Sequence, residues 1–400
     1  MMPSIGIYTY SVKPRGSVVH AASLAEALAD EGADVTLYAL AKNGDGFFRP
    51  LRCPLVLVPA GPAPAEPDRL ILQRIAELQA GMATQRARHD VYHAEDCLTA
   101  SALVSAVPRL APVVRTVHHV EHFESPYLAA CQRRSIIQSD LVLSVSRRTA
   151  REVESEFGRG SRIVHNGVDL SRFGAPHTPE PALARDLALS ADDVLVLSVG
   201  GVEARKNMLQ ALDAMIGALV GSPRLHWVVA GGASIWDHSE LERRFDARVA
   251  ELPDGVRRRI LRTGAVDEPT LTWLYQRSDL VLCPSLHEGW GLCVLEALAA
   301  GTAVIASARA PFTEYLDFDV ACLVDPTSTV AIQGAVLALA GDARRRAELG
   351  AAGRKRAEQF SWRRAAQAHL EAYRALLTDP SAATFARAQS ASASSLSPGV

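Results

Sequence analysis

Two glutamates, Glu288 and Glu296, stand eight positions apart in the segment 287–297, which follows the apolar run 280–285. Glycines occupy positions 289 and 291 between the first glutamate and an expected helix. At about 3.6 residues per turn, Glu296 lies two turns along that helix, and Glu288 lies in the loop before it. The unpaired N–H groups and the positive dipole end of the helix favour an anion. An anion between two carboxylates is the geometry of a nucleotide sugar, with one carboxylate toward the sugar and the other toward the ribose.

A second group of polar residues follows the β-rich run 194–199. Gly200 and Gly201 end this run, and Arg205 and Lys206 stand just before a helix expected from about position 207. Arginine offers a planar fork of donors and lysine a compact charge, and the two together suit a diphosphate. Each motif also has a structural interpretation, because the glutamates could be helix-dipole partners and the basic pair a solvated turn. The occurrence of both motifs, each after a strand and beside glycines, favours a binding site.

His118 ends the apolar run 113–118 and therefore lies at the carboxyl end of an expected strand, where ligands of open α/β sheets bind. The sequence His118-His119-x-x-His122 also suggests a zinc site. It differs from the pattern H-E-x-x-H, because its second residue is His119 and because it follows a strand instead of lying within a helix. We therefore expect no metal here, and a purely structural role is the remaining alternative for His118.

The elements that position these residues alternate between apolar strands and helical stretches along the whole chain. Continuous apolar strands with helical crossovers imply parallel sheets that are covered on both faces. About thirteen strands are too many for one such sheet, so we expect an α/β protein with two doubly wound domains. The expected strands are 5–10, 35–40, 55–58, 91–93, 113–118, 141–146, 162–165, 194–199, 227–230, 260–263, 280–284, 303–306 and 321–324.

The domain boundary is expected between 173 and 190, where prolines interrupt the periodicity. It separates a first domain, 1–175, from a second domain, 176–360. A final helix within 361–378 could cross back to the first domain. The segment 379–400 is rich in alanine and serine and has too little apolar content to pack, so we expect it to be disordered.

The composition describes an ordinary globular protein, with 48% hydrophobic and 22% charged residues in 400. A net charge of −2 gives no general attraction to nucleic acid or anionic lipid. Six scattered cysteines without a C-x-x-C pair favour reduced thiols in the cytoplasm. No apolar run reaches the roughly 18–20 residues of a membrane span, and no signal peptide precedes the first strand. We expect a cytoplasmic protein with at most peripheral membrane contact.

Taken together, these motifs resemble those of glycosyltransferase family 4, the retaining nucleotide-sugar transferases of the GT-B fold, over roughly residues 5–377. The resemblance implies two Rossmann-like domains facing a central cleft, with the acceptor on the first domain and the donor on the second. Arg15 replaces one of two glycines that the family often has before the first helix, although Gly16 remains. The motifs that carry the resemblance are Pro284-Ser285-x-x-Glu288-Gly289-x-Gly291-Leu292-x3-Glu296-Ala297, Gly200-Gly201-x3-Arg205-Lys206-Asn207, Asn166-Gly167-Val168-Asp169, Gly231-Gly232 and Gly264-Ala265-Val266.

Sugar transfer needs charge neutralisation on the leaving diphosphate, for which Arg205 and Lys206 are the candidates together with the amides of residues 289–292. That arrangement needs no divalent metal and no other cofactor. Glu288 is the candidate for contacting the transferred sugar, as a nucleophile, a charge stabiliser or an orienting group, and the resemblance favours front-face attack by the acceptor. The resemblance also implies that His118 lies near the sugar. Glu296 is expected to accept hydrogen bonds from the ribose.

The other expected donor-binding residues are mostly glycines of the two motifs. Gly16 would let a phosphate or sugar approach the backbone closely, although it could be a plain turn glycine. Val266 would pack near the base, although it could be a strand-end core residue. The full expected set is Gly16, Gly200, Gly201, Val266, Gly289, Trp290, Gly291, Leu292 and Glu296.

The expected function is retaining, metal-independent transfer of a hexosyl group from a UDP-, GDP- or ADP-linked sugar to a small-molecule, lipid or glycan acceptor. Two alternatives stay open: a nucleotide-sugar epimerase or hydrolase of the same fold, and a non-catalytic nucleotide-sugar-binding protein. The loops 42–49 and 60–68 would select the acceptor, but their sequences do not identify it.

Overall fold

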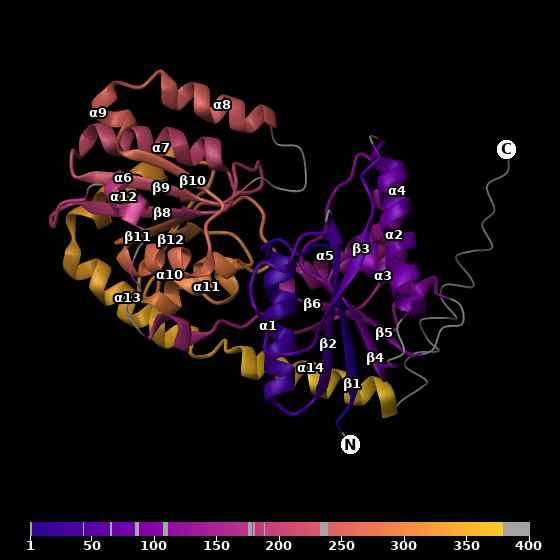
Figure 1. Cartoon of the computed structure of the whole chain (residues 1–400). Helices are drawn as coiled ribbons and strands as arrows, with labels where there is room; N and C mark the ends of the chain where they lie inside the picture. Colours follow the sequence, from indigo (N-terminus) through magenta and orange to yellow (C-terminus); the bar gives the residue numbers. More distant parts are fainter. Residues whose placement is uncertain are drawn as a thin grey trace. The chain divides into compact units, whose positions relative to one another are not determined.

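The computed structural model describes residues 2–42, 44–64, 66–84, 88–106, 111–174, 178, 181–187, 189–232 and 239–378 (Figure 1). The chain forms two compact units. The first comprises Met1–Gly167 with the C-terminal segment that begins at Trp362, and the second is Val168–Ser361. The division therefore follows Gly167, earlier than the boundary expected at 175/176, while residues 175–177 and the tail 379–400 lie outside the described residues.

The first unit contains a sheet of seven parallel strands in the order β3-β2-β1-β4-β5-β6-β7. The strands alternate with helices, as the apolar runs predict. The strands are β1 (Ser4–Thr9), β2 (Asp34–Lys42), β3 (Leu55–Ala60), β4 (Val91–Ala94), β5 (Val113–Val117), β6 (Leu141–Ser144) and β7 (Arg162–Ile163). The helices are α1 (Gly16–Asp30), α2 (Pro67–Thr84), α3 (Cys97–Val104), α4 (Pro126–Ile137), α5 (Arg147–Phe157) and, from the end of the chain, α14 (Trp362–Thr378).

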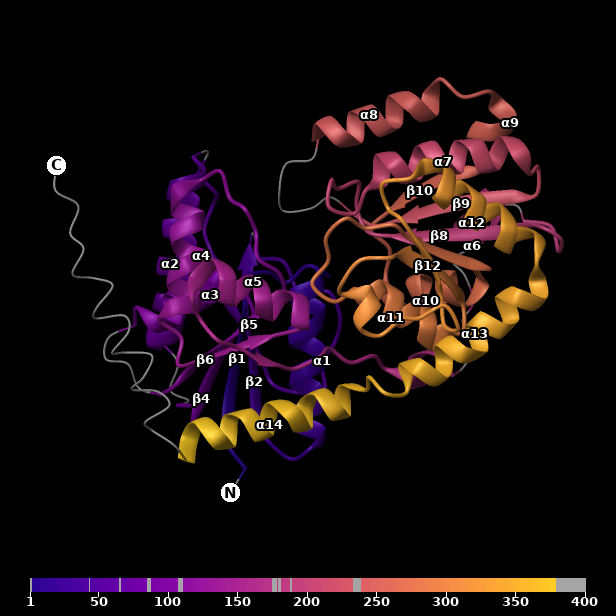
Figure 2. The same cartoon turned by 180° about the vertical axis from the view of Figure 1, so that it is seen from behind.

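Helix α14 belongs to the first unit, because it packs against α1 (Figures 1 and 2). Its buried side chains recur at helical spacing, which gives it one apolar face. Ala366, Leu370, Tyr373 and Leu376 on that face join the core formed by α1, β1 and β2. The chain thus returns to its N-terminal half after completing the second unit.

The second unit contains six parallel strands in the order β10-β9-β8-β11-β12-β13. Its core lies under α7 and α12. The strands are β8 (Val194–Val199), β9 (Leu225–Ala230), β10 (Ile260–Gly264), β11 (Leu280–Cys283), β12 (Ala303–Ser307) and β13 (Cys322–Val324). The helices are α6 (Pro181–Leu187), α7 (Met208–Gly221), α8 (Ser239–Ala250), α9 (Asp254–Arg257), α10 (Glu268–Arg277), α11 (Leu292–Ala300), α12 (Thr329–Gly341) and α13 (Ala343–Ala357), with short 3-10 helices η1 (Leu170–Phe173) and η2 (Phe312–Glu314).

In both sheets the strand order reverses at one place, between β1 and β4 in the first unit and between β8 and β11 in the second. Ligands of open α/β sheets bind outside the carboxyl ends of the strands at such a reversal. The segments that follow these four strands are therefore the places where a site is expected in each unit.

All the expected strands are present among the described residues, and the prediction of two doubly wound α/β domains is confirmed. Differences are confined to element ends. The strand expected over 141–146 ends at Ser144, because the Ser146 side chain caps α5 by accepting a hydrogen bond from the Thr149 amide. Within the described part of the chain, no helix is both long and apolar enough to cross a membrane.

Candidate active site

Two loops meet at the strand reversal of the second unit, one after β8 and one after β11. The amides of Leu286 and His287 both donate to the carbonyl oxygen of Arg205, at 2.8 and 3.2 Å. Asn207, which precedes α7 with a positive φ of 61°, donates from its side chain to the Pro284 carbonyl at 3.2 Å. These bonds hold the two sequence motifs side by side, although about eighty residues separate them.

Arg205, Lys206 and Glu288 form one cluster in these loops. Arg205 Nη1 lies 2.9 Å from Glu288 Oε2, and Lys206 Nζ lies 3.4 Å from Glu288 Oε1. The Ser285 hydroxyl donates to Glu288 Oε1 at 3.1 Å, and Arg205 Nε lies 2.8 Å from the carboxylate of Glu203. The Glu288 side chain is only 9% exposed, so its charge is balanced by the two cations and not by water.

The cluster keeps Lys206 charged. Burial alone would lower the pKa of Lys206, but the neighbouring Glu288 carboxylate outweighs burial and the pKa is raised. Two cations and the carboxylates of Glu203 and Glu288 therefore sum to about zero charge. An incoming diphosphate would compete with these carboxylates for Arg205 and Lys206, since all of them are acceptors of the same donor groups.

Gly200 is required where it stands. Its φ is +126°, and a Cβ there would lie 2.5 Å from Lys206 Cε, because the lysine side chain folds back over the glycine. Gly201 is in similarly close contact, with the Gly232 carbonyl 2.7 Å from the position of a Cβ. Gly200 therefore lets Lys206 lie directly over the end of β8, and Gly201 lets the loop that follows β9 approach the backbone.

Gly291 has a φ of +91° and precedes α11, whose N-terminus has no side-chain cap. A Cβ on Gly291 would lie 2.5 Å from the Phe312 ring. Gly289 is buried, Leu292 begins the helix, and Trp290 is 3% exposed with its ring stacked on Tyr315 at a centroid distance of 4.6 Å. The Trp290 side chain thus supports the loop from inside, and any donor contact at this residue would have to come from its backbone.

Glu296 lies on α11 and is held by two residues that the sequence did not reveal. Its Oε1 is 3.2 Å from Arg172 Nη1, and its Oε2 accepts from the Tyr275 hydroxyl at 2.8 Å. Burial raises the pKa of Glu296, and Arg172 and Tyr275 oppose that rise without cancelling it. Each carboxylate oxygen can accept a further hydrogen bond, so the expected contact with a ribose hydroxyl stays a prediction.

Two predicted donor-binding residues, Val266 and Gly16, lie outside the two motif loops. Val266 is half-buried in the loop between β10 and α10. Gly16 is exposed at the first position of α1, and apart from its chain neighbours and the backbone of its own helix turn, no described atom lies within 4 Å of where its Cβ would be. The protein itself therefore gives no steric reason for a glycine at position 16.

In the first unit, His118 follows β5 and contacts Glu95, which follows β4 at the strand reversal. His118 Nε2 lies 2.8 Å from Glu95 Oε2, and His20 Nδ1 on α1 lies 2.9 Å from the same oxygen. Burial lowers the pKa of His118 to about 4, against the opposing effect of Glu95. The pKa of Glu95 is held well below its usual value, because the histidines outweigh the effect of burial.

These three residues form the one group of potential metal ligands found in the described part of the chain. It is not the His118-His119-x-x-His122 set that the sequence suggested. His119 contacts Glu121 instead, at 2.6 Å, and His122 is exposed. Glu95 and His20 had no local sequence signal, since they lie 23 and 98 positions before His118.

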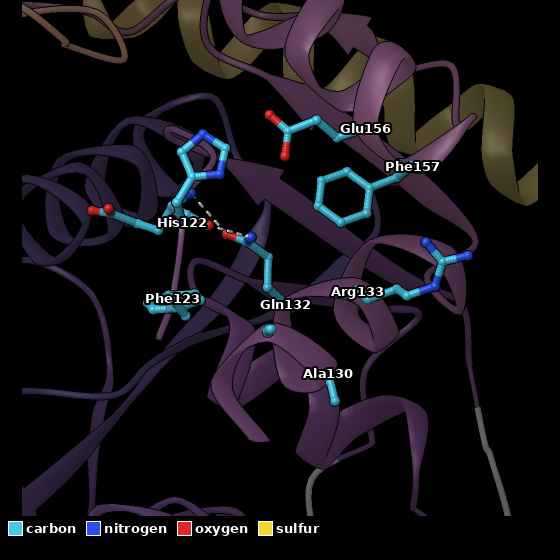
Figure 3. Close-up of a pocket in the computed structure, with 9 residues that line it drawn as sticks. His122, Phe123, Ala130, Gln132, Arg133, Glu156 and Phe157 are labelled. Atoms are coloured by element: carbon cyan, nitrogen blue, oxygen red, sulfur yellow. Dashed lines mark hydrogen bonds between the residues drawn. The ribbon is translucent and has the colours of Figure 1, made fainter. Parts of the chain in front are cut away.

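A surface hollow of about 390 Å³ lies beside the loop that follows His118 (Figure 3). Gln132 on α4 fixes this loop, because its amide donates to the Glu121 carbonyl at 2.8 Å and accepts from the Glu121 amide at 3.1 Å. Figure 3 shows Arg133 and Phe157 on one side of Gln132 and His122 on the other. The hollow is lined by Glu121, His122, Phe123, Ala129, Ala130, Gln132, Arg133, Glu156 and Phe157.

Comparison with known families and proteins matches nearly the whole chain. Residues 14–172 match the profile of Glycosyltransferase Family 4, and residues 180–356 match that of Glycosyl transferases group 1. A D-inositol 3-phosphate glycosyltransferase of Xylanimonas cellulosilytica is 29% identical over 392 residues, which cover 90% of this chain and 91% of that protein. An uncharacterised glycosyltransferase of Methanocaldococcus jannaschii is 26% identical and covers 79% of this chain and 83% of its own.

Solved structures share the fold. Sucrose-phosphate synthase from Thermosynechococcus elongatus superposes with a TM-score of 0.78 at 21% identity, covering 94% of this chain and 99% of its own. Anabaena HepE in complex with UDP-glucose superposes with a TM-score of 0.77 at 18% identity, covering 94% of this chain and 100% of its own. Because the two profiles together span most of the chain, and because solved glycosyltransferases share its fold, the chain belongs to glycosyltransferase family 4 and is a transferase of the GT-B fold.

Proposed function

We propose that this glycosyltransferase moves a hexosyl group from a nucleotide sugar to an acceptor hydroxyl, with retention of anomeric configuration and without a metal ion. The observation that carries the proposal is the cluster of Arg205, Lys206 and Glu288 at the strand reversal of the second unit, next to the uncapped N-terminus of α11. Such a cluster has the charges and the donors that a sugar diphosphate requires.

Each residue of the cluster has a role in this proposal. Arg205 and Lys206 bind the diphosphate and stabilise the charge that develops on it as the glycosidic bond breaks. Glu288 then exchanges its partners, turning from the two cations to the hydroxyls of the sugar. The positive charges that a divalent cation would otherwise supply come from Arg205 and Lys206. His118 remains the residue of the first unit that we expect to contact the sugar.

The donor and acceptor are proposed from the relatives. UDP-glucose is the first donor to test, because HepE is solved with it, and an ADP-linked sugar is next, because a plant starch synthase of this fold is solved with ADP. The first acceptor to test is a phosphorylated cyclitol, the kind of molecule named for several relatives. Lipid and glycan acceptors complete the range.

The test measures nucleoside diphosphate released from a panel of UDP-, GDP- and ADP-sugars, with and without acceptors. Release that depends on the acceptor supports transfer, acceptor-independent consumption of donor supports an epimerase or hydrolase, and binding without turnover supports a non-catalytic protein. The anomeric proton coupling of the product decides retention or inversion. Undiminished turnover in excess EDTA is expected, and a strict requirement for added divalent metal would contradict metal independence.

A further inference from the structure

Glu95 is a buried carboxylate for which the reaction proposed above has no direct use. It is 1% exposed and follows β4 at the strand reversal of the first unit. One of its oxygens, Oε2, lies 2.9 Å from His20 Nδ1 and 2.8 Å from His118 Nε2. Burying a carboxylate costs free energy that an apolar side chain of the same size would not. Packing alone therefore gives no reason for a glutamate at this position.

The shared oxygen determines which nitrogens carry hydrogen. An ionised carboxylate is an acceptor only, so both imidazole nitrogens that contact it must donate. His118 is consequently protonated at Nε2. Because the ring of His118 is neutral at physiological pH, its other nitrogen, Nδ1, carries a lone pair. No described residue is hydrogen-bonded to Nδ1, and the His118 side chain is 14% exposed while those of His20 and Glu95 are fully buried.

We propose that Glu95 is a positioning residue, which fixes the ring of His118 and its Nε2–H tautomer so that Nδ1 accepts a hydrogen bond from a substrate hydroxyl. This inference rests on the proposed function, because it takes His118 as a substrate contact. It assigns to His118 the role of an acceptor and not of a cation. His20 shares the role of Glu95 by occupying the second lone pair of the same oxygen.

Three histidines, His20, His93 and His118, surround the Glu95 carboxylate, and His93 is itself fixed by two further elements. On β4, His93 Nε2 lies 3.6 Å from Glu95 Oε1 and 2.7 Å from the Thr116 hydroxyl of β5. The other ring nitrogen of His93 is 2.5 Å from the Tyr373 hydroxyl of α14. On α1, the ring of His20 packs edge-on against His118, with ring centroids 4.8 Å apart. A buried carboxylate that shares one oxygen between His20 and His118 can impose an orientation on His118.

The charged and titratable groups around His118 raise or lower its pKa, each in a definite direction. Glu95 favours the protonated ring, while burial, which is the largest single cause, His20 and the buried Arg115 of β5 all disfavour it. The pKa of His118 therefore lies at about 4, and the ring stays neutral without Glu95 as well. Replacing Glu95 changes the tautomer of His118 and not its charge.

The variant Glu95→Gln tests this directly, because the amide keeps the shape but can present either an acceptor or a donor to His118. Nitrogen-15 NMR of histidine-labelled protein distinguishes the tautomers, and the His118→Asn variant identifies the His118 signal. The wild type should show Nε2–H, and Glu95→Gln should show a mixture with Nδ1–H. The kcat for transfer should fall by at least about tenfold, while the donor KM changes by less than about threefold.

The matched control is Asp140→Asn. Asp140 is a buried carboxylate, 6% exposed, that accepts from the Val113 amide at 2.8 Å at the opposite end of β5. This variant should lower the unfolding temperature but leave the tautomer of His118 and the kcat as in the wild type. A matching loss of kcat in both variants would mean that Glu95 acts only through stability, and would overturn the proposal.

Three other results would overturn it. The first is an Nδ1–H tautomer of His118 in the wild type, and the second is a Glu95→Gln variant with wild-type kcat. The third is a wild type that retains stoichiometric zinc after dialysis, while the variants His20→Asn and Glu95→Gln do not. A wild type without any transferase activity would remove the proposed function. The tautomer of His118 would still decide the hydrogen-bond assignment in that case, because the NMR measurement needs no turnover.

Discussion

Among single residues, Glu288 has two parts in the proposal, because it pairs with two cations and is expected to contact the sugar. It is a buried carboxylate between Arg205 and Lys206, and the reaction that we propose requires it to turn toward the sugar. Glu288→Gln keeps the size and removes the charge. We expect kcat to fall by about 100-fold with a smaller change in donor KM, because the lost interaction acts mainly in the transition state.

Glu26→Gln is the control for this prediction. Glu26 is also a buried carboxylate in an ion pair, 2.7 Å from Arg49, but it lies on α1 in the first unit. Its replacement should reduce stability and leave kcat unchanged. Equal kcat values for Glu288→Gln and the wild type would contradict the role of Glu288.

At Gly16, one substitution is expected to weaken substrate binding without lowering stability. Since the position of its Cβ is open apart from its chain neighbours and its own helix backbone, Gly16→Ala should not strain the protein and should stabilise α1 slightly, by about 0.5 kcal/mol. If a phosphate or sugar approaches the backbone here, the added methyl group raises KM severalfold. Steady-state kinetics and thermal unfolding measure the two effects.

Gly334→Ala in α12, where a Cβ is equally unobstructed, is the matched control and should change stability only. An unchanged KM in Gly16→Ala would show that Gly16 is an ordinary glycine at a helix start.

The residues that sequence reasoning missed have one thing in common. Arg172 contacts Glu296 across 124 positions, and Tyr275 contacts it across 21. Such partners come from different elements, and their pairing depends on how helices pack and not on a local spacing. The motifs around Glu288 and Arg205 could be found because each occupies one loop after one strand. Even there, the sequence did not show that Glu288 pairs with both cations.

At the scale of elements, the strands were predictable and their ends less so. Continuous apolar runs give parallel strands because both faces of such a sheet are buried. A cap such as Ser146 ends an element through one side-chain hydrogen bond, which periodicity does not reveal. The partner of α14 was left open as well, because an apolar helix face does not identify the surface it covers.

Three buried histidines of the first unit, one of them on α14, make this unit sensitive to acid. Burial lowers the pKa of His369 on this helix to about 3, and it lowers the pKa of His93 and of His118 to about 4. Above pH 6.5 these histidines are neutral in both states and contribute nothing. As pH falls from about 6.5 to 4, only the unfolded chain binds protons, so each histidine lowers the free energy of unfolding by up to about 1.4 kcal/mol per pH unit.

Urea denaturation across this pH range measures the slope. His369→Leu removes one of the three groups and keeps a side chain of similar size, so its slope should be shallower than that of the wild type. Identical slopes would show that the pKa of His369 is not depressed in the folded protein. Glu95 adds to the loss only from about pH 4.5 downward, where the unfolded chain takes up its proton and the folded chain, with its depressed pKa, does not.

At the scale of the whole molecule, two doubly wound sheets each present their strand reversal to a different set of side chains. The second unit gathers cations and carboxylates there, and the first gathers histidines around one carboxylate. That the second domain binds the donor and the first the acceptor stays a prediction. The sequence indicated the second set through Arg205, Lys206 and Glu288, but the first set through His118 alone.

The central claim is that Arg205 and Lys206 hold the diphosphate of the donor. Calorimetric titration of the full-length protein with UDP, GDP and ADP, and with the matching monophosphates, tests it most directly. We expect one diphosphate to bind at least about tenfold more tightly than its monophosphate, and Lys206→Met to abolish that difference while the monophosphate binds as before. Equal affinity of wild type and Lys206→Met for every diphosphate would contradict the account.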